Sequence, residues 1–237
     1  SCESIFSKFY PDKLKVASRD LTNLPLLEML AKTKIPIIIS TGMSDKKDID
    51  NALEVITKSH ENISILHCLS QYPSEYKNLN LNTIPFLKQE YPNYKIGYSD
   101  HSVGISIPIS AVAMGAEIIE KHITLDRNMK GTDHIGSLAP KGLHNMIRDI
   151  RNLDDSFGEF KIIKSKYVLS AKNKLERSIA SKSFIPKNTV IKEDMLKLLS
   201  PGDGHKWAER KLVIGKVSKI DISKNEIIYS RFLKNEN

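Results

Sequence analysis

Residues 95–124 read KIGYSDHSVGISIPISAVAMGAEIIEKHIT, and this stretch decides the fold. It holds two segments typical of strands, 95–98 and 118–121, separated by residues 103–114, where apolar side chains recur at helical spacing. A strand, a helix and a second strand in this order form a unit whose two strands lie parallel in one sheet. The stretch therefore predicts an α/β fold.

The same pattern extends towards the N-terminus. Three more apolar segments of strand length, 14–17, 36–39 and 63–66, each precede a helix-like or loop stretch. Leu24, Leu27 and Leu30 mark a helix after the first of them, and the acidic residues of 45–50 mark the start of another. Five such βα units predict a parallel sheet covered by helices.

The pattern changes near Gly158. Residues 159–175 are lysine-rich and show no alternation of strand and helix, so we expect a connecting linker after a first domain over 1–158. Residues 176–237 are expected to form a small β-rich domain. Its predicted strands lie at 178–180, 189–191, 212–216 and 226–229.

Composition narrows the class of protein. The chain has 36 Lys and Arg against 28 Asp and Glu, a formal charge of +8, but the basic residues are spread along it. This favours a solvated lysine-rich surface over nucleic-acid binding, with attraction of anionic substrates as the alternative. No segment approaches the roughly 18 apolar residues of a membrane span. Cys2 and Cys68 make no disulfide framework, which predicts a cytoplasmic protein.

Each of the five predicted strands ends in small or polar side chains. In parallel α/β folds the active site lies at the carboxyl ends of the strands. We therefore expect one site shared by all five ends, although strand ends are often polar without a function. The residues concerned are Ser18, Ser40-Thr41-Gly42, Cys68 with Ser70, Ser99-Asp100-His101, and His122 with Thr124.

Two histidines stand out among these residues. Side chains alternate across a strand, so Ser99 and His101 share one side and Asp100 faces the other. Glu120 and His122 likewise share a side of the next strand. If the two strands are neighbours, His101 and His122 converge, and two imidazoles suit a divalent metal ion. Structural, hydrogen-bonded histidines remain the alternative.

Three further positions have a functional and an ordinary interpretation. Lys15 lies inside an apolar strand, where a lysine meets an anion or extends to solvent. Residues 40–43 form either an anion site at a helix start or a simple turn. Asp133 could bind a sugar hydroxyl or transfer a proton, or serve as a turn residue, and Ser137 could be a helix N-cap.

Taken together, these motifs resemble the N-acylneuraminate (sialic acid) synthase family. The C-terminal part is similar to the antifreeze-like domain that ends these enzymes, with Pro201-Gly202 and 214–216 in place. In the first domain the resemblance rests on KVAS at 15–18, STGM at 40–43, LHC at 66–68 with Tyr72-Pro73, GYSDHS at 97–102, EKHITLD at 120–126, and Asp133-His134 with Ser137-Leu138.

The resemblance implies a fold and an activity. The family fold is a TIM (βα)8 barrel followed by a β-clip antifreeze-like domain, of which this chain supplies the last five barrel strands. The implied reaction joins phosphoenolpyruvate to an N-acylated amino sugar, giving a sialic- or legionaminic-type nonulosonic acid and phosphate. It uses Mn²⁺ or Mg²⁺ and a homodimer with swapped C-terminal domains, without nucleic acid or membrane. We expect the first three strands to be absent and this chain alone to be inactive.

The resemblance also implies residue roles. They are metal binding for His101 and His122, phosphoenolpyruvate binding for Lys15, Ser18 and Ser99, sugar contacts for Tyr72 and Asp133, a substrate-pocket position for Ser70, and catalysis for Asp133 and Glu120.

Position 200 departs from the family pattern. Well-known relatives have Arg before Pro-Gly where this chain has Ser200, so Lys206 in the same loop is the expected replacement. The expected sugar is then not plain N-acetylmannosamine but one such as a diacetamido-6-deoxyhexose. Two other functions stay open. One is a non-catalytic carbohydrate-binding or assembly fragment, and the other is a different metal-dependent aldolase.

Overall fold

The computed structural model describes residues 9–163 and 165–234. The chain forms two compact units, 1–158 and 159–237, which are described separately. Cys2 lies outside the described residues, whereas Cys68 is buried and forms no disulfide within them. In the described part of the chain, no helix is both long and apolar enough to cross a membrane.

A single five-stranded sheet organises the first unit. Each strand pairs in parallel with the next strand along the chain, as the sequence predicts. This unbroken order is that of a barrel wall, because doubly wound sheets reverse their strand order at a switch point. The strands are β1 (Leu14–Val16), β2 (Ile37–Ser40), β3 (Ile63–Cys68), β4 (Lys95–Asp100) and β5 (Ile118–Lys121).

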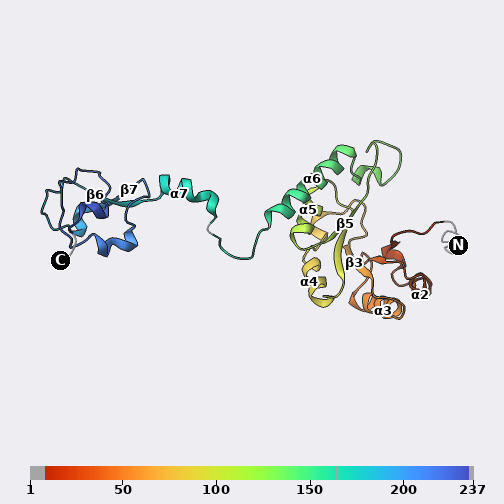
Figure 1. Ribbon diagram of the computed structural model, residues 1–237. Helices are drawn as coiled ribbons and strands as arrows, with labels where there is room; N and C mark the ends of the chain where they lie inside the picture. The colour runs from red at the N-terminus through yellow and green to blue at the C-terminus, as the bar shows by residue number, and fades with distance from the viewer. Residues whose placement is uncertain (1–8, 164, 235–237) are drawn as a thin grey trace. The chain divides into compact units, whose positions relative to one another are not determined.

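Helices flank the sheet, as Figure 1 shows. Asp45 caps α3 by accepting the Asp48 N–H, and Asp48 returns the bond in a capping box, so the predicted acidic helix start is confirmed. The helices are α2 (Leu24–Lys32), α3 (Lys46–Thr57), α4 (Thr83–Glu90), α5 (Ser106–Ala113) and α6 (Pro140–Ser156), with 3₁₀ turns η1 (Ser18–Asp20), η2 (Tyr76–Asn78) and η3 (His134–Gly136).

The two faces of the sheet differ in chemistry. One face, here the outer face, packs the buried apolar side chains of the strands against the helices, with Ile37, Ile65 and Ile96 at most 1% exposed. The opposite, inner face carries polar side chains. Lys15 Nζ of edge strand β1 lies 3.6 Å from Glu120 Oε2 of the other edge strand, β5. Because the two edges approach across the inner face, the sheet is curled into a half-barrel.

The second unit is a small β-rich domain with its own core. Its elements are η4 (Lys166–Val168), α7 (Leu169–Leu175), β6 (Ser178–Ser181), η5 (Glu193–Met195), β7 (Leu196–Leu199), η6 (Trp207–Leu212) and η7 (Ser230–Phe232). Strand β6 pairs antiparallel with β7, and the core includes Ile179, Val213 and Ile222. The segment expected to be a linker thus contains a helix.

Of the four strands predicted in the second unit, only the one at 178–180 is confirmed as a regular strand. Residues 189–191 and 226–229 contribute single bridges, and the strand predicted at 212–216 is wrong. The positive φ angles of Asn188, Gly215 and Asn225 explain this, because a left-handed residue turns the chain out of an extended ladder. Strand β7 was not predicted.

Candidate active site

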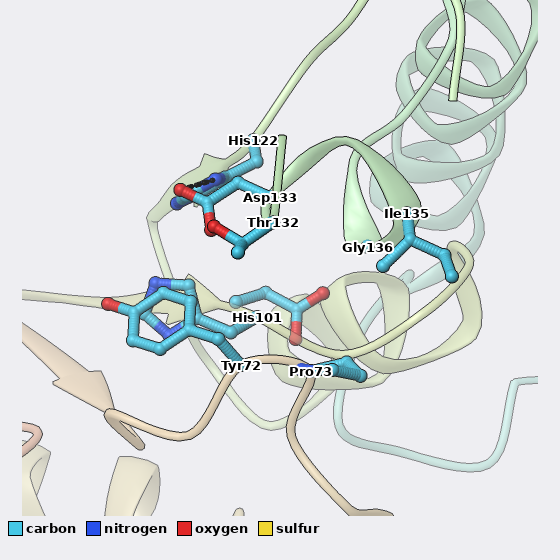
Figure 2. Close-up of a pocket in the computed structure, with 9 residues that line it drawn as sticks. Tyr72, Pro73, His101, His122, Thr132, Asp133, Ile135 and Gly136 are labelled. Carbon is cyan, nitrogen blue, oxygen red and sulfur yellow. Dashed lines mark hydrogen bonds and ion pairs between the residues drawn. The ribbon is translucent and has the colours of Figure 1, made fainter. Parts of the chain in front are cut away.

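A pocket lies at the carboxyl ends of β3, β4 and β5, shown in Figure 2. Loops after β3, β4 and β5 supply its walls, because parallel strands end at one edge of their sheet. The lining residues are Tyr72, Pro73, Asp100, His101, His122, Thr132, Asp133, Ile135 and Gly136.

His101 and His122 converge as predicted. Ser99 pairs with Glu120 and Asp100 with Lys121, so the histidines stand one position further at the ends of neighbouring strands. Their ring centroids lie 5.3 Å apart in an edge-to-face arrangement. His101 Nδ1 lies 2.9 Å from the Leu69 carbonyl oxygen. With the proton on Nδ1 donated there, Nε2 keeps a lone pair for a ligand.

Tyr72 and Asp133 border the histidine pair. The Tyr72 ring centroid lies 4.0 Å from that of His101 and 6.0 Å from that of His122. Asp133 Oδ2 lies 3.8 Å from His122 Nδ1. Burial raises the pKa of Tyr72, and the charges of Asp133 and Glu120 add to the effect, so its hydroxyl stays a proton donor.

A chain of three interacting polar side chains, Lys15, Glu120 and Ser99, crosses the inner face beside the histidines. Glu120 Oε1 accepts a hydrogen bond from Ser99 Oγ at 2.7 Å, while its Oε2 lies 3.6 Å from Lys15 Nζ. Lys15 also donates to the Val16 carbonyl oxygen at 3.0 Å. The side chain of Lys15 is 31% exposed, so its ammonium faces the inner side of the half-barrel rather than reaching freely into solvent. Glu120 thereby positions both a cation and a hydroxyl.

Ser18 and Ser70 meet around Gly42. The Gly42 N–H donates to Ser18 Oγ at 3.0 Å. A Cβ on Gly42 would stand 2.5 Å from Ser70 Oγ, 2.9 Å from Cys68 Sγ and 3.0 Å from Ser18 Oγ. A side chain is excluded here because three strand ends, those of β1, β2 and β3, meet at the Gly42 backbone.

Ser40 also belongs to the site; the sequence placed it among the polar strand ends but gave it no individual role. It is 2% exposed, and its Oγ has no hydrogen-bond partner among the described residues. This hydroxyl is therefore available to bind water or a ligand. The alternation of side chains along β2 places Ser40 on the inner face. Ile38 pairs with Lys15 of β1, and Ser40, two residues after Ile38, faces the same side.

The loop between β5 and α6 folds back on itself, so that Asp133 lies beside His122. The Leu138 N–H donates to the His122 carbonyl oxygen, and the Thr124 N–H donates to the Leu138 carbonyl oxygen, both at 2.9 Å. Ser137 Oγ donates to the Asp133 carbonyl oxygen at 2.6 Å. Ser137 is therefore a loop residue, and its interpretation as an N-cap is wrong, because α6 begins after Ala139.

Lys206 lies in the second unit, and its ammonium is already paired there. Its Nζ is 2.9 Å from Glu176 Oε2 and donates to the Gly202 carbonyl oxygen. Ser200 Oγ accepts a hydrogen bond from Arg177 at 3.3 Å and donates to the Leu175 carbonyl oxygen at 3.0 Å. A contact from Lys206 to a sugar stays a prediction.

The donor set suits a metal ion that is only partly held by protein. Within residues 9–163 and 165–234, no group of three or more His, Cys, Asp or Glu side chains is arranged to hold a metal by itself. His101 and His122 offer two imidazoles, and the remaining coordination positions would fall to water and substrate. The residues present fit such an open site.

Comparison with known proteins covers both units. The NeuB family model matches residues 3–162, and the SAF domain model matches residues 176–233. An uncharacterised protein of Methanocaldococcus jannaschii is 38% identical over 95% of this chain and 67% of its own length. The N,N'-diacetyllegionaminic acid synthase of Campylobacter jejuni is 36% identical over 90% of this chain and 65% of its own.

A solved structure agrees with both the fold and the sequence match. The N-acetylneuraminic acid synthetase of Leptospira borgpetersenii, in complex with citrate, superposes with a TM-score of 0.66 at 36% identity. The match covers 71% of this chain and 59% of that protein. The chain thus spans about three fifths to two thirds of the length of these relatives.

Proposed function

Because the chain belongs to the NeuB family, we propose that the intact protein condenses phosphoenolpyruvate with an N-acylated amino sugar. The products are a nonulosonic acid of the sialic or legionaminic type and phosphate. The observation that carries this proposal is the meeting of His101 and His122 beside the Lys15–Glu120–Ser99 chain on one inner face. The names of the synthases from Campylobacter and Leptospira support it.

Phosphoenolpyruvate fits the part of the site nearest β1, β2 and β4. Its phosphate and carboxylate need cations and hydrogen-bond donors, and Lys15 supplies a compact positive charge. The buried Ser40 hydroxyl has no described partner and is free to donate to a ligand. Ser18 and Ser99 place two further hydroxyls at the carboxyl ends of β1 and β4. Glu120 keeps Lys15 and Ser99 in place for this anion.

The sugar occupies the pocket between Tyr72, the histidines and Asp133. His101 and His122 would hold Mn²⁺ or Mg²⁺, which when bound polarises the aldehyde of the open-chain sugar as a Lewis acid. The protonated Tyr72 hydroxyl can donate to a sugar oxygen, and the Asp133 carboxylate can accept from a sugar hydroxyl. Ser70, beside Gly42, lies where the two substrates would meet.

The reaction balances as follows. The enol carbon of phosphoenolpyruvate forms a bond to the aldehyde carbon, and the aldehyde oxygen gains a proton. Water adds to the adjacent carbon and loses a proton. The hydroxyl on that carbon then loses its proton as the carbon–oxygen bond to phosphate breaks, leaving a 2-keto acid, and the departing phosphate takes up this proton. Asp133 and Glu120 are the carboxylates placed to move these protons, on the sugar side and the phosphoenolpyruvate side respectively.

The sugar and the assembly are finer parts of this proposal. We infer a diacetamido-6-deoxyhexose as substrate, because Ser200 replaces the arginine expected before Pro-Gly and the Campylobacter relative is named for a diacetylated product. The proposal includes a cytoplasmic homodimer in which each SAF domain serves the partner's site. The SAF match over residues 176–233 supplies the domain that such an arrangement needs.

Phosphate release by the intact protein tests the function. The protein is mixed with phosphoenolpyruvate, Mn²⁺ and either N-acetylmannosamine or a diacetamido-6-deoxyhexose, and products are identified by mass. We expect phosphate and a nonulosonic acid in equal amounts, faster with the diacetamido sugar. No product with either sugar, together with measurable sugar binding, would favour the carbohydrate-binding alternative instead.

A further inference from the structure

A buried ion pair lies behind the two histidines. Lys121 Nζ stands 2.6 Å from Asp100 Oδ2, and their side chains are only 2% and 0% exposed. Both residues lie on the outer face, opposite Ser99 and Glu120, because side chains alternate along β4 and β5. Neither residue contributes to the proposed chemistry, although each directly precedes one of the histidines.

The pair fixes the chain on both sides of His101, because Asp100 precedes it and both side chains bond the backbone of Ser102, which follows it. Lys121 Nζ donates to the Ser102 carbonyl oxygen as well as to Asp100. Asp100 Oδ1 accepts from the Ser102 N–H at 2.9 Å and from the Tyr98 hydroxyl at 3.2 Å. Burial raises the pKa of Tyr98, with the charge of Asp100 adding to the effect, so this hydroxyl remains a donor. Residues 100 and 102 are thus tied to β5 with His101 between them.

Stability alone is a weak reason for such a pair. Removing two charges from water costs several kcal/mol per ion, and apolar side chains of similar volume often serve as well. A fully hydrogen-bonded ionic network instead favours a single arrangement of the groups that it joins. What this network joins is the pair of strand ends that carry His101 and His122, whose ring centroids are 5.3 Å apart.

We propose that Asp100 and Lys121 are positioning residues that set the distance and orientation of His101 and His122 across the carboxyl edge of the sheet. The network holds the ends of β4 and β5 in register by linking Asp100, Lys121 and Ser102. The consequence for metal binding rests on the proposed function, whereas the geometric claim does not.

The test compares Asp100→Asn, Lys121→Met and the double variant with wild type. Lys88→Met is the matched control, because Lys88 also contacts the region of β5 but at its amino end, through Gly115 and Glu117. Ring-to-ring nuclear Overhauser effects between His101 and His122 report the geometry. Electron paramagnetic resonance titration with Mn²⁺ reports the affinity of the intact protein, and urea unfolding reports stability.

We expect each single variant to lose the ring-to-ring signal and at least tenfold in Mn²⁺ affinity, while Lys88→Met keeps both. The double variant, free of an uncompensated buried charge, should regain stability over Lys121→Met without regaining the ring-to-ring signal. If the double variant is folded and keeps the signal at wild-type intensity, the proposal is wrong. If wild type shows the signal but binds no Mn²⁺, the metal part of the proposed function fails and the signal still decides the positioning claim.

Discussion

The inner and outer faces of the five-stranded sheet differ in the side chains they carry and in how far these are buried. The outer face buries Ile37, Ile65 and Ile96 against helices, and its charged pair is sealed from water. The inner face leaves Lys15 and Glu120 partly exposed and keeps a buried Ser40 hydroxyl without a described partner. Side chains two positions apart on a strand therefore face the same environment, whereas adjacent side chains do not.

This difference predicts a separation between stability and chemistry. Changes to the apolar side chains of the outer face should lower the free energy of unfolding, because they remove packed volume. Inner-face changes should lower turnover with little effect on unfolding, because those groups are arranged for a ligand. Each prediction below tests that separation, beginning with the largest expected effect.

The first prediction concerns the histidines of the intact protein. His101→Ala or His122→Ala should reduce phosphate release on the order of a thousandfold, the equivalent of the several kcal/mol that a Lewis acid contributes. Unfolding should change little, because His122 is 37% exposed. His60→Gln is the control, since His60 precedes β3 at the amino end of the sheet. Near-normal turnover in both alanine variants would remove the metal assignment.

The second prediction concerns the outer-face core. Ile65→Ala should lower the free energy of unfolding by about 2–5 kcal/mol, because a fully buried isoleucine leaves a cavity. Ser64→Ala is the matched change at the neighbouring position on the opposite face, and it should cost about 1 kcal/mol or less. Urea titration measures both. Equal losses in the two variants would contradict the division between the faces.

The third prediction concerns the close approach at Gly42. Gly42→Ala places a methyl group 2.5 Å from Ser70 Oγ, so the three strand-end loops must move apart. We expect about tenfold or more lower kcat/KM, equal to the loss of one or two hydrogen bonds to substrate. Gly136→Ala is the control, because the atoms nearest to its added methyl group would be 3.9 Å away. Equal kinetics in the two variants would refute the crowding argument.

The fourth prediction concerns pH and the outer-face histidine, His67. Burial lowers its pKa from 6.5, opposed by the hydrogen bond of Nε2 to the Leu79 carbonyl oxygen. The unfolded chain therefore binds a proton more readily than the fold, so stability is present above pH 6.5 and is lost as pH falls through the lowered value. The free energy of unfolding should fall less steeply below pH 6.5 in His67→Gln. An identical pH slope would exclude His67 as the cause.

The sheet could be predicted because its signals are local. Each strand is a short apolar run, and the polar groups follow at its carboxyl end, so the alternation placed His101 and His122 together. The sequence placed Ser40 at a strand end but gave it no role, because the lack of a described hydrogen-bond partner is seen only in the packed structure. The network of Asp100 and Lys121 was missed for a similar reason. The alternation placed Asp100 on the side of β4 opposite His101, but the sequence does not show that its charge meets that of Lys121.

The second unit was harder to predict because regular ladders are short there. Isolated β-bridges, such as the one between Val190 and Val217, connect its segments, and residues with positive φ angles end the extended stretches near them. Strand β7 (Leu196–Leu199) reads LKLL, a pattern too short to separate strand from helix. Tertiary packing around Ile179 and Ile222 decides its conformation instead.

Anomalous diffraction from crystals of the intact protein grown with Mn²⁺ and phosphoenolpyruvate tests the central claim most directly. If the inner face carries the chemistry, a manganese peak will lie at the imidazoles of His101 and His122, with phosphoenolpyruvate beside Lys15, Ser40 and Ser99. Manganese bound away from both histidines, or phosphoenolpyruvate bound away from the inner face, would contradict the account.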